Sequence, residues 1–302
     1  MILRFHAPPE VARLLPESDA ILYLNLKPVR AITHFDDKPV APSPEYAAFL
    51  NGTGFRWDRD LDRVAVSLHR MADPKGPNGV VAYTGVVEGR FDAAKLTAYL
   101  KSNSTATETY AGHTVYTVPG TEGRMLRVTP LGYDMVAASN MPTPEQIHSV
   151  IDRYATGATP FSGSSLLSSR YREVPLFALA WGIGHVGLPF SDRGNIQVFG
   201  ITLPLSEDTD FIASLTPHGS LHPRVDLRVE ELAPSEGEAA QTATNLSTIL
   251  NLVRGFTAGG ATGQDAAVRE AFQSLQVESK RSRVVLTGNV TESLLTSATT
   301  AK

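Results

Sequence analysis

Alternation of apolar and polar residues predicts strands through the first half of the chain. Segment 19–27 is the clearest, because Leu22, Leu24 and Leu26 share one face of an extended chain. The same criteria predict strands at 63–69, 79–88, 113–118, 124–129 and 133–139. Two prolines and a glycine in segment 72–78 predict a hairpin connection between the second and third strands.

Two helices are predicted among these strands. Segment 91–101 has Asp92 at the position favoured for a helix N-cap. Segment 143–154 has Thr143 as its predicted cap and Pro144 in its first turn. Apolar residues recur in this second segment at helical spacing, so we expect one side of the helix to be buried.

The second half of the chain is predicted to contain a similar mixture of elements. Strands are predicted at 175–181, 195–203, 210–215 and 225–230, with a closing hairpin at 276–279 and 283–289. Helices are predicted at 162–171, 235–256, 265–275 and 291–298. Ser235 and Glu238 have the spacing of a capping box, and Gly255 with Gly259 and Gly260 is predicted to end the long helix.

These elements indicate an α+β protein with mainly antiparallel sheets and helices packed on one face, because helices rarely alternate singly with strands. A polar, Gly/Ser-rich stretch at 158–172 is interpreted as a linker. We therefore expect an N-terminal α+β half at 1–157 and a C-terminal α+β half at 173–302, either separate or packed as one unit. Their similar element order suggests two related halves, although residue identity between them is negligible.

Composition excludes several classes of protein. The chain has 302 residues, of which 42% are hydrophobic, enough for a sizeable core. A net charge of −4 argues against nucleic acid as a partner, because non-specific binding needs a basic surface. No apolar run is long enough to span a bilayer as a helix, so we expect a soluble chain without a transmembrane segment. The absence of cysteine excludes disulfides and thiolate metal sites.

One glycine motif resembles a dinucleotide-binding sequence. Gly182, Gly184 and Gly187 fit the pattern G-x-G-x-x-G and follow a predicted strand. The motif also needs a helix that opens at the third glycine, whereas segment 188–194 leads into another strand. We therefore interpret these glycines as a flexible hairpin loop and expect no cofactor.

Two histidines raise the possibility of a metal site. His218 and His222 are four residues apart, as in helical zinc sites, but Pro217 and Pro223 flank them. We expect a solvated loop here, with His218, His222 and His185 as the weak candidates for a metal or catalytic role.

Signatures of nucleophilic catalysis and phosphate binding are absent from the sequence. There is no G-x-S-x-G motif, and the glycine-rich segment 259–264 lacks the Lys-Ser/Thr pair of a phosphate loop. Adjacent carboxylates such as Glu230 and Glu231 point to opposite faces of a strand, so they are expected at the surface without a shared proton.

Segment 55–63 combines charge with aromatic residues. Three arginines and three aspartates are interleaved with Phe55 and Trp57. The aromatic residues would suit a nucleic-acid or sugar platform, but the charges nearly cancel. We expect an exposed, self-paired turn that leads into a strand.

Phrases in the first half resemble a bacterial protein family. They are Pro16–Ala20 and Asp60–Ala65, each leading into a strand, Glu88–Asp92 at a strand-to-helix junction, and Tyr110–Tyr116 before a strand. Together they resemble uncharacterised bacterial proteins described as domains of unknown function, many of them exported to the cell envelope. The resemblance lies mainly in residues 16–140. It implies a periplasmic or envelope location and an N-terminal leader or anchor ahead of this chain, which itself has no apolar leader segment. Without such a leader, we expect a cytoplasmic location.

Two classes of function stay open. The first is a non-catalytic binding or scaffold module of the bacterial cell envelope, whose exposed strand edges could bind a protein partner or a second copy. The second is a hydrolase or metal-dependent enzyme whose site is assembled only in three dimensions from His185, His218 or His222 and a carboxylate. A concave pocket that gathers two of these histidines would favour the enzyme.

Overall fold

The computed structural model describes residues 7–37, 43–73, 81–120, 123–157, 163–185, 195–198, 201–204, 209–218, 224–258 and 266–290. Its contacts divide the chain into two compact units, one made mainly of residues up to Arg172 and the other mainly of residues from Glu173 onward. Strand pairs within each unit are antiparallel, and helices pack on the strands. The prediction of an antiparallel α+β protein is confirmed.

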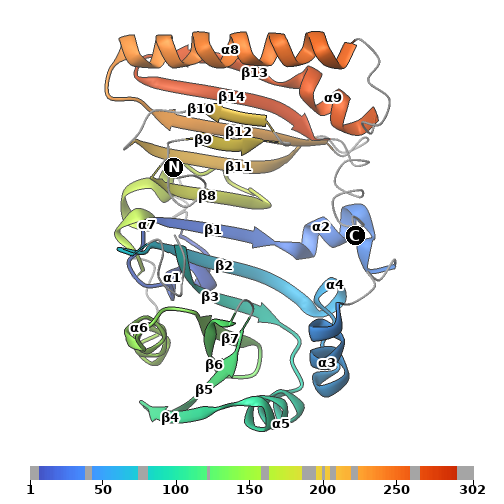
Figure 1. Cartoon of the computed structure of the whole chain (residues 1–302), viewed down its shortest axis with the longest axis vertical. Helices are drawn as coiled ribbons and strands as arrows, with labels where there is room; N and C mark the ends of the chain where they lie inside the picture. The colour runs from blue at the N-terminus through green and yellow to red at the C-terminus, as the bar shows by residue number, and fades with distance from the viewer. Residues whose placement is uncertain are drawn as a thin grey trace, which may run out of the picture. The chain divides into compact units, whose positions relative to one another are not determined.

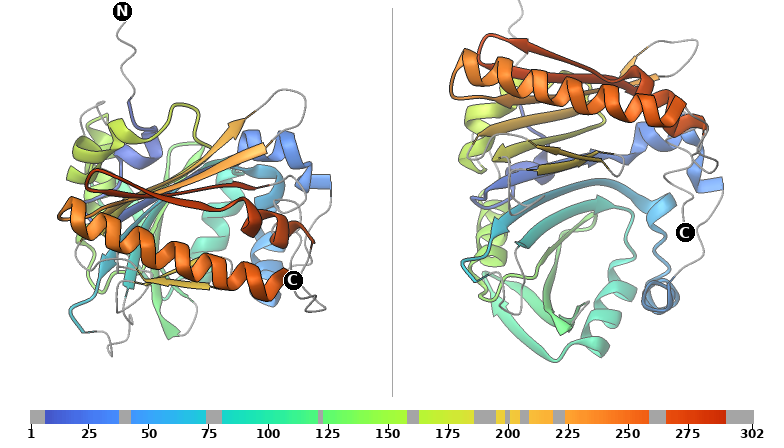
Figure 2. Two further views of the ribbon diagram at one scale, coloured as in Figure 1. Left: turned by 90° about the horizontal axis from the view of Figure 1, so that it is seen from above. Right: turned by 45° about the horizontal axis from the view of Figure 1, so that its top comes forward.

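The sheet of the first unit has the order β1-β2-β3-β7-β6-β5-β4 (Figure 1). Its strands are β1 (Ala20–Asn25), β2 (Leu61–Arg70), β3 (Val81–Gly89), β4 (Ala106–Tyr110), β5 (His113–Pro119), β6 (Met125–Leu131) and β7 (Met135–Ser139). Strand β4, which the alternation did not predict, pairs with β5 and forms the edge of this sheet. The strands from β7 to β4 curve away from β2 and β3 (Figure 2).

Short helices surround this sheet. They are α1 (Glu10–Arg13), α2 (Leu26–Thr33), η1 (Phe35–Asp37), α3 (Pro44–Thr53), α4 (Trp57–Asp60), α5 (Ala93–Asn103), α6 (Glu145–Ala155), α7 (Ser165–Arg170) and η3 (Tyr171–Glu173). Asp92 caps α5 as predicted, since its side chain accepts a hydrogen bond from the Lys95 backbone amide at 3.0 Å. The prediction of Thr143 as the cap of α6 is wrong, because Pro144 occupies the N-cap position without a side-chain bond.

Helix α5 covers an apolar core in the first unit. Leu96 and Leu100 of the helix pack on Tyr116, Val128 and Val136 of the strands. Leu96 and Leu100 are one helical turn apart, so both reach the same face of the sheet. Helix α6 packs instead against β6 and β7.

The sheet of the second unit has the order β13-β14-β12-β11-β8. Its strands are β8 (Ala180–His185), β11 (Asp210–His218), β12 (Arg224–Leu232), β13 (Gln276–Lys280) and β14 (Arg283–Val290), with β9 (Asn195–Val198) and β10 (Ile201–Pro204) in a separate hairpin. Helix α8 (Glu236–Ala258) packs on β13 and β14, and α9 (Ala266–Ser274) packs on β14. Leu246 and Leu250 of α8 meet Val284 and Leu286 in the core.

Two strand predictions for the second unit are wrong. The predicted strand 195–203 is two strands that pair with each other. Helix α8 ends at Ala258, within two residues of its predicted end at residue 256. Strand β8 begins at Ala180 rather than at residue 175 and includes the first two motif glycines.

Some predicted features lie outside the described residues. These are Gly187, His222, the segments 188–194 and 259–264, the terminal helix at 291–298 and most of the 72–78 hairpin loop. The two strands that this loop joins are described, and they pair antiparallel from Leu61 to Arg70. Among the described helices, none combines the length and the apolar character needed to cross a bilayer.

Candidate functional site

The two described candidate histidines of the second unit, His185 and His218, lie beside opposite ends of β11. His185 pairs across the sheet with Asp210, and its Nδ1 atom is 2.9 Å from the Asp210 carboxylate. His218 is the last residue of β11 and has a side chain that is 75% exposed, with Nδ1 3.5 Å from Asp226. Eight residues of strand separate these two sites, about 27 Å. The described residues bring neither histidine into a cluster of three or more metal-ligating side chains.

The first two glycines of the G-x-G-x-x-G motif lie inside a strand. Gly182 and Gly184 pair with Ala213 and Phe211 of β11, and the neighbouring Trp181 and Ile183 are buried. The prediction of a hairpin loop at these glycines is therefore wrong. Burial explains the strand, because a segment packed on both faces does not need polar alternation.

Ser67 and His69 form the closest approach to a catalytic pair in the first unit. They lie two residues apart on β2, and the Ser67 hydroxyl is 3.2 Å from His69 Nε2. The same hydroxyl donates its single proton to the Thr84 carbonyl oxygen at 3.0 Å. His69 Nε2 must then be the donor to Ser67, so the imidazole cannot take the serine proton in this arrangement.

Burial also separates this pair from any substrate. Ser67 is fully buried, and burial lowers the pKa of His69, with a smaller opposing effect from Asp19. The row of hydroxyls continues across the sheet, where Thr84 and Ser139 are 2.9 Å apart. These groups satisfy one another inside the core, which is a structural role.

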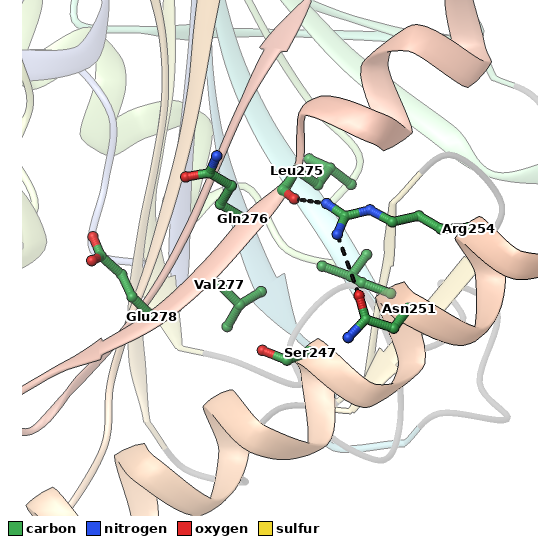
Figure 3. A pocket seen from close by; sticks show the side chains of 8 residues that line it. Ser247, Asn251, Arg254, Leu275, Gln276, Val277 and Glu278 are labelled. Atoms are coloured by element: carbon green, nitrogen blue, oxygen red, sulfur yellow. Dashed lines mark hydrogen bonds between the residues drawn. The ribbon is translucent and has the colours of Figure 1, made fainter.

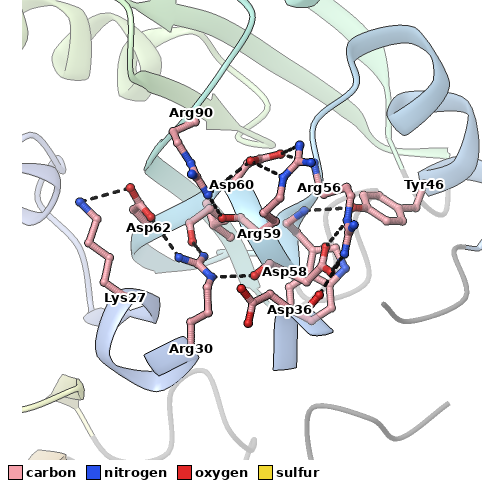
Figure 4. Close-up of polar contacts among 12 residues, drawn as sticks. Lys27, Arg30, Asp36, Tyr46, Arg56, Asp58, Arg59, Asp60, Asp62 and Arg90 are labelled. Atoms are coloured by element: carbon pink, nitrogen blue, oxygen red, sulfur yellow. Dashed lines mark hydrogen bonds and ion pairs between the residues drawn. The ribbon is translucent and has the colours of Figure 1, made fainter. Parts of the chain in front are cut away.

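Segment 55–63 forms a partly buried network rather than the exposed turn that was predicted (Figure 4). Asp58 and Asp60 are only 4% and 5% exposed. Asp60 accepts hydrogen bonds from Nε and Nη2 of Arg59 and from the Arg56 amide, and Arg90 lies 3.5 Å away. Burial alone would raise the pKa of Asp60, but these contacts outweigh it and lower the pKa.

The network fixes α2 against the start of β2. Arg30 of α2 donates to the Asp58 carbonyl at 2.8 Å and to the Asp62 carboxylate at 3.3 Å, and Lys27 lies 3.2 Å from Asp62 (Figure 4). Trp57 stacks on Phe35 at a centroid distance of 5.7 Å. Each of these charged groups has a partner within the unit, so the segment holds elements together.

The carboxylates Glu230 and Glu231 are buried, so the prediction of a surface pair is wrong. Their side chains nevertheless have separate partners. Glu230 accepts hydrogen bonds from Arg228 at 2.7 Å and from Arg283 at 2.9 Å, while Glu231 accepts one from Thr209 at 3.5 Å. Burial alone would raise the pKa of Glu230, but the two guanidinium groups outweigh it and lower the pKa.

A cavity of about 460 Å³ in the second unit lies between α8 and β13 (Figure 3). The lining residues are Ser247, Leu250, Asn251, Arg254, Leu275, Gln276, Val277 and Glu278. We call this cavity the α8/β13 trough. Its volume is within the range of about 300–1,000 Å³ typical of ligand sites.

The lining pattern shows how the trough is built. The helix residues follow the spacing of one helical face, and the strand residues are consecutive. Side chains of a strand alternate between two faces, so a cavity on one face would be lined by every second residue. This cavity is lined by Leu275 and then by three consecutive strand residues, Gln276 to Glu278, so it runs along the edge of the strand.

Arg254 closes one end of the trough. Its guanidinium group donates to the carbonyl oxygens of Gln273 and Leu275 and to the Asn251 side chain (Figure 3). Bonds to the last carbonyls of α9 fix the helix end against α8. The wall of the trough is therefore held in place before any ligand binds.

Sequence reasoning missed the trough. Ser247, Asn251 and Arg254 share one flank of the predicted helix at spacings of four and three. That spacing was available from the sequence, but it is typical of any solvent-facing flank. Only the position of β13 beside the helix turns the flank into a wall.

Comparison with known proteins gives a fold and no family. No protein-family model matches the chain, and no curated protein matches it. Crystal form III of the treponemal protein TP0453 is similar over 96% of this chain and 97% of that chain, with a TM-score of 0.51 and 11% identity. The chain shares its fold with TP0453. Crystal form IV of TP0453 gives a TM-score of 0.49 at 11% identity.

The likeness to TP0453 is limited to architecture. At 11% identity, the two proteins need share no ligand, activity or partner. The function of this chain has to be inferred from its own residues.

Proposed function

We propose that this chain is a non-catalytic binding module of the bacterial cell envelope, with its ligand site in the α8/β13 trough. The observation that carries the proposal is the trough itself, which joins one helix face to Leu275 and the first three residues of the edge strand β13. The lining combines the apolar side chains of Leu250 and Val277 with the polar side chains of Ser247 and Asn251. Such a lining provides both apolar contact and hydrogen bonds to a ligand.

The described groups that most resemble a catalyst are poorly arranged for catalysis. The Ser67 hydroxyl is buried and already donates to a carbonyl, and His185 and His218 lie at opposite ends of β11. The trough itself contains no histidine among its lining residues. These features favour binding over bond cleavage.

The binding site is tested by screening small amide and carboxylate fragments against the isotope-labelled chain by NMR. We expect fragment-induced shifts to gather at the lining residues of α8 and β13. Ser247→Arg places a long side chain in the trough and should abolish these shifts. Thr248→Arg is the matched control, since Thr248 is exposed on α8 outside the lining. Equal shifts in both variants, or shifts gathered elsewhere, would contradict the site.

The envelope location rests on the resemblance in residues 16–140. It is tested by immunoblotting fractions of a bacterium that carries the gene, with a cytoplasmic enzyme as marker. Recovery in the envelope or periplasmic fraction supports the location, and recovery with the cytoplasmic marker contradicts it.

An enzyme is the alternative, and one pair of residues favours it. His185 Nδ1 is 2.9 Å from Asp210, and the histidine side chain is 49% exposed, so a substrate could reach it. Carboxylate-oriented imidazole is a common general base. Turnover of chromogenic esters or phosphates, with or without zinc, that is lost in His185→Ala would support the enzyme over the binding module.

A further inference from the structure

We infer that the ligand of the α8/β13 trough is an extended peptide segment that pairs with β13 as an additional strand. This inference rests on the proposed function and names the chemical class of its ligand. It follows from three features of the second unit: an open strand edge, the direction of the backbone groups on that edge, and a matching helix wall.

Strand β13 is the edge of its sheet. It pairs with β14 from Gln276↔Thr287 to Lys280↔Arg283, and no strand of the described residues pairs with its other side. An edge strand has backbone amides and carbonyls that an additional strand can bind. The trough runs along this side, as its consecutive lining residues require.

The register gives the direction of the backbone groups. Lys280 pairs with Arg283 across a loop of two residues, Arg281 and Ser282. In such a hairpin the backbone groups of Lys280 and Arg283 bond to each other. Backbone bonding alternates along an antiparallel pair, so the amides and carbonyls of Gln276 and Glu278 also point toward β14. Val277 and Ser279 direct their amides and carbonyls toward the open edge.

The helix wall has the same length as the strand wall. From Ser247 to Arg254 the helix rises about 10 Å, and from Leu275 to Glu278 the strand extends about 10 Å. A segment of about four extended residues fills that length. Its side chains would alternate, with every second one directed toward Leu250 and the others toward solvent.

The probe for this inference is a phage-displayed library of random 12-residue peptides, selected on the full chain. Enriched peptides are synthesised, and their affinities are measured for the wild type, Ser247→Arg and Thr248→Arg. We expect at least tenfold weaker binding to Ser247→Arg and unchanged binding to Thr248→Arg. Each peptide is then N-methylated at one backbone position at a time.

Strand pairing makes a specific prediction for the N-methyl series. Methylation at every second position should weaken binding at least tenfold, because those amides donate to β13, while the intervening positions tolerate the methyl group. The wild-type protein is used throughout this series, so a folding defect cannot produce the pattern.

The outcomes separate the two proposals. Peptides that bind Ser247→Arg as tightly as the wild type, or a failure to enrich any peptide, would contradict the peptide ligand. In that case the fragment experiment alone decides whether the trough is a binding site. Loss of binding to Ser247→Arg without an alternating N-methyl pattern keeps the site and overturns strand pairing.

Discussion

The imidazole ring of His148 lies parallel to the phenol ring of Tyr110, with centroids 3.8 Å apart and planes 3° apart. His148 Nε2 is 2.7 Å from the Glu108 carboxylate, and the Tyr110 hydroxyl donates to Asp152 at 3.0 Å. These contacts connect the edge strand β4 to helix α6. Within the described part of the chain β4 pairs with β5 alone, so its second attachment is made by side chains.

Removal of the histidine should loosen β4. His148→Ala deletes both the stack and the Glu108 contact, and we expect the local opening free energy of β4 to fall by about 1 kcal/mol. Hydrogen exchange of the Ala106 and Glu108 amides, which face β5 in this register, should accelerate about fivefold, as measured by NMR. Tyr110→Phe keeps the stack and should give a smaller effect. Equal exchange rates in the wild type and His148→Ala would show that the contacts do not hold the strand.

Replacing Phe177 by glycine should stabilise the folded chain, because Phe177 has a left-handed backbone conformation in an exposed turn. Phe177 has φ of +69° and is 77% exposed, in a turn where the Ala178 amide donates to the Pro175 carbonyl at 3.3 Å. This conformation favours glycine over a bulky residue. Phe177→Gly should raise the free energy of unfolding by about 0.5–1 kcal/mol, measured by urea denaturation.

The neighbouring residue provides the control for that substitution. Leu176 is also exposed, but its φ is not positive. Leu176→Gly should lower stability by about 0.5–1 kcal/mol, because glycine adds freedom to the unfolded chain. The same sign for both substitutions would contradict the strain at Phe177.

The buried hydroxyl of Ser67 is predicted to contribute to stability. Ser67→Ala removes the bond to the Thr84 carbonyl and leaves that acceptor and His69 with one partner fewer. We expect a loss of about 1–2 kcal/mol in the free energy of unfolding, measured by chemical denaturation. Any hydrolytic activity of the wild type should be unchanged in this variant. If Ser67→Ala kept wild-type stability but lost hydrolytic activity, Ser67 would have a catalytic role instead.

Acid should destabilise the chain partly through Glu230. Its pKa is lowered in the folded state, so between that value and the unfolded pKa of about 4.3 the unfolded chain binds more protons. The stability from Glu230 is therefore present above pH 4.3 and is lost as pH falls through the folded pKa. Glu230→Gln should lower stability at pH 7 and flatten this acid slope, as measured by urea denaturation from pH 7 to pH 3. An unchanged slope would show that other carboxylates dominate.

Local patterns predicted the strands that have one polar face and the helices that have clear start signals. Asp92 and Ser235 cap α5 and α8 through their side chains, because both bonds form within one turn of the chain. Strand β4 was missed because all but its last residue are exposed, which leaves no apolar alternation to detect.

The misread segments share a physical cause. The composition around Gly182 and Gly184 is typical of a loop, yet both glycines lie in a strand that pairs with β11, and both are buried. Asp58, Asp60 and Glu230 were expected at the surface, but they are buried beside Arg56, Arg59 and Arg228, each one or two residues away in the sequence. The self-pairing within segment 55–63 was predicted, whereas burial depends on elements far along the chain, such as Arg283 beside Glu230 and Arg90 beside Asp60.

The sequence by itself determined the class of protein: an antiparallel α+β chain without cysteine chemistry or a recognisable catalytic motif. Periodicity, caps and composition carry that information because they act over a few residues. The tertiary structure decided which surfaces meet. The trough exists because helix α8 lies beside the edge of β13, two elements about twenty residues apart whose contact depends on a shared apolar core.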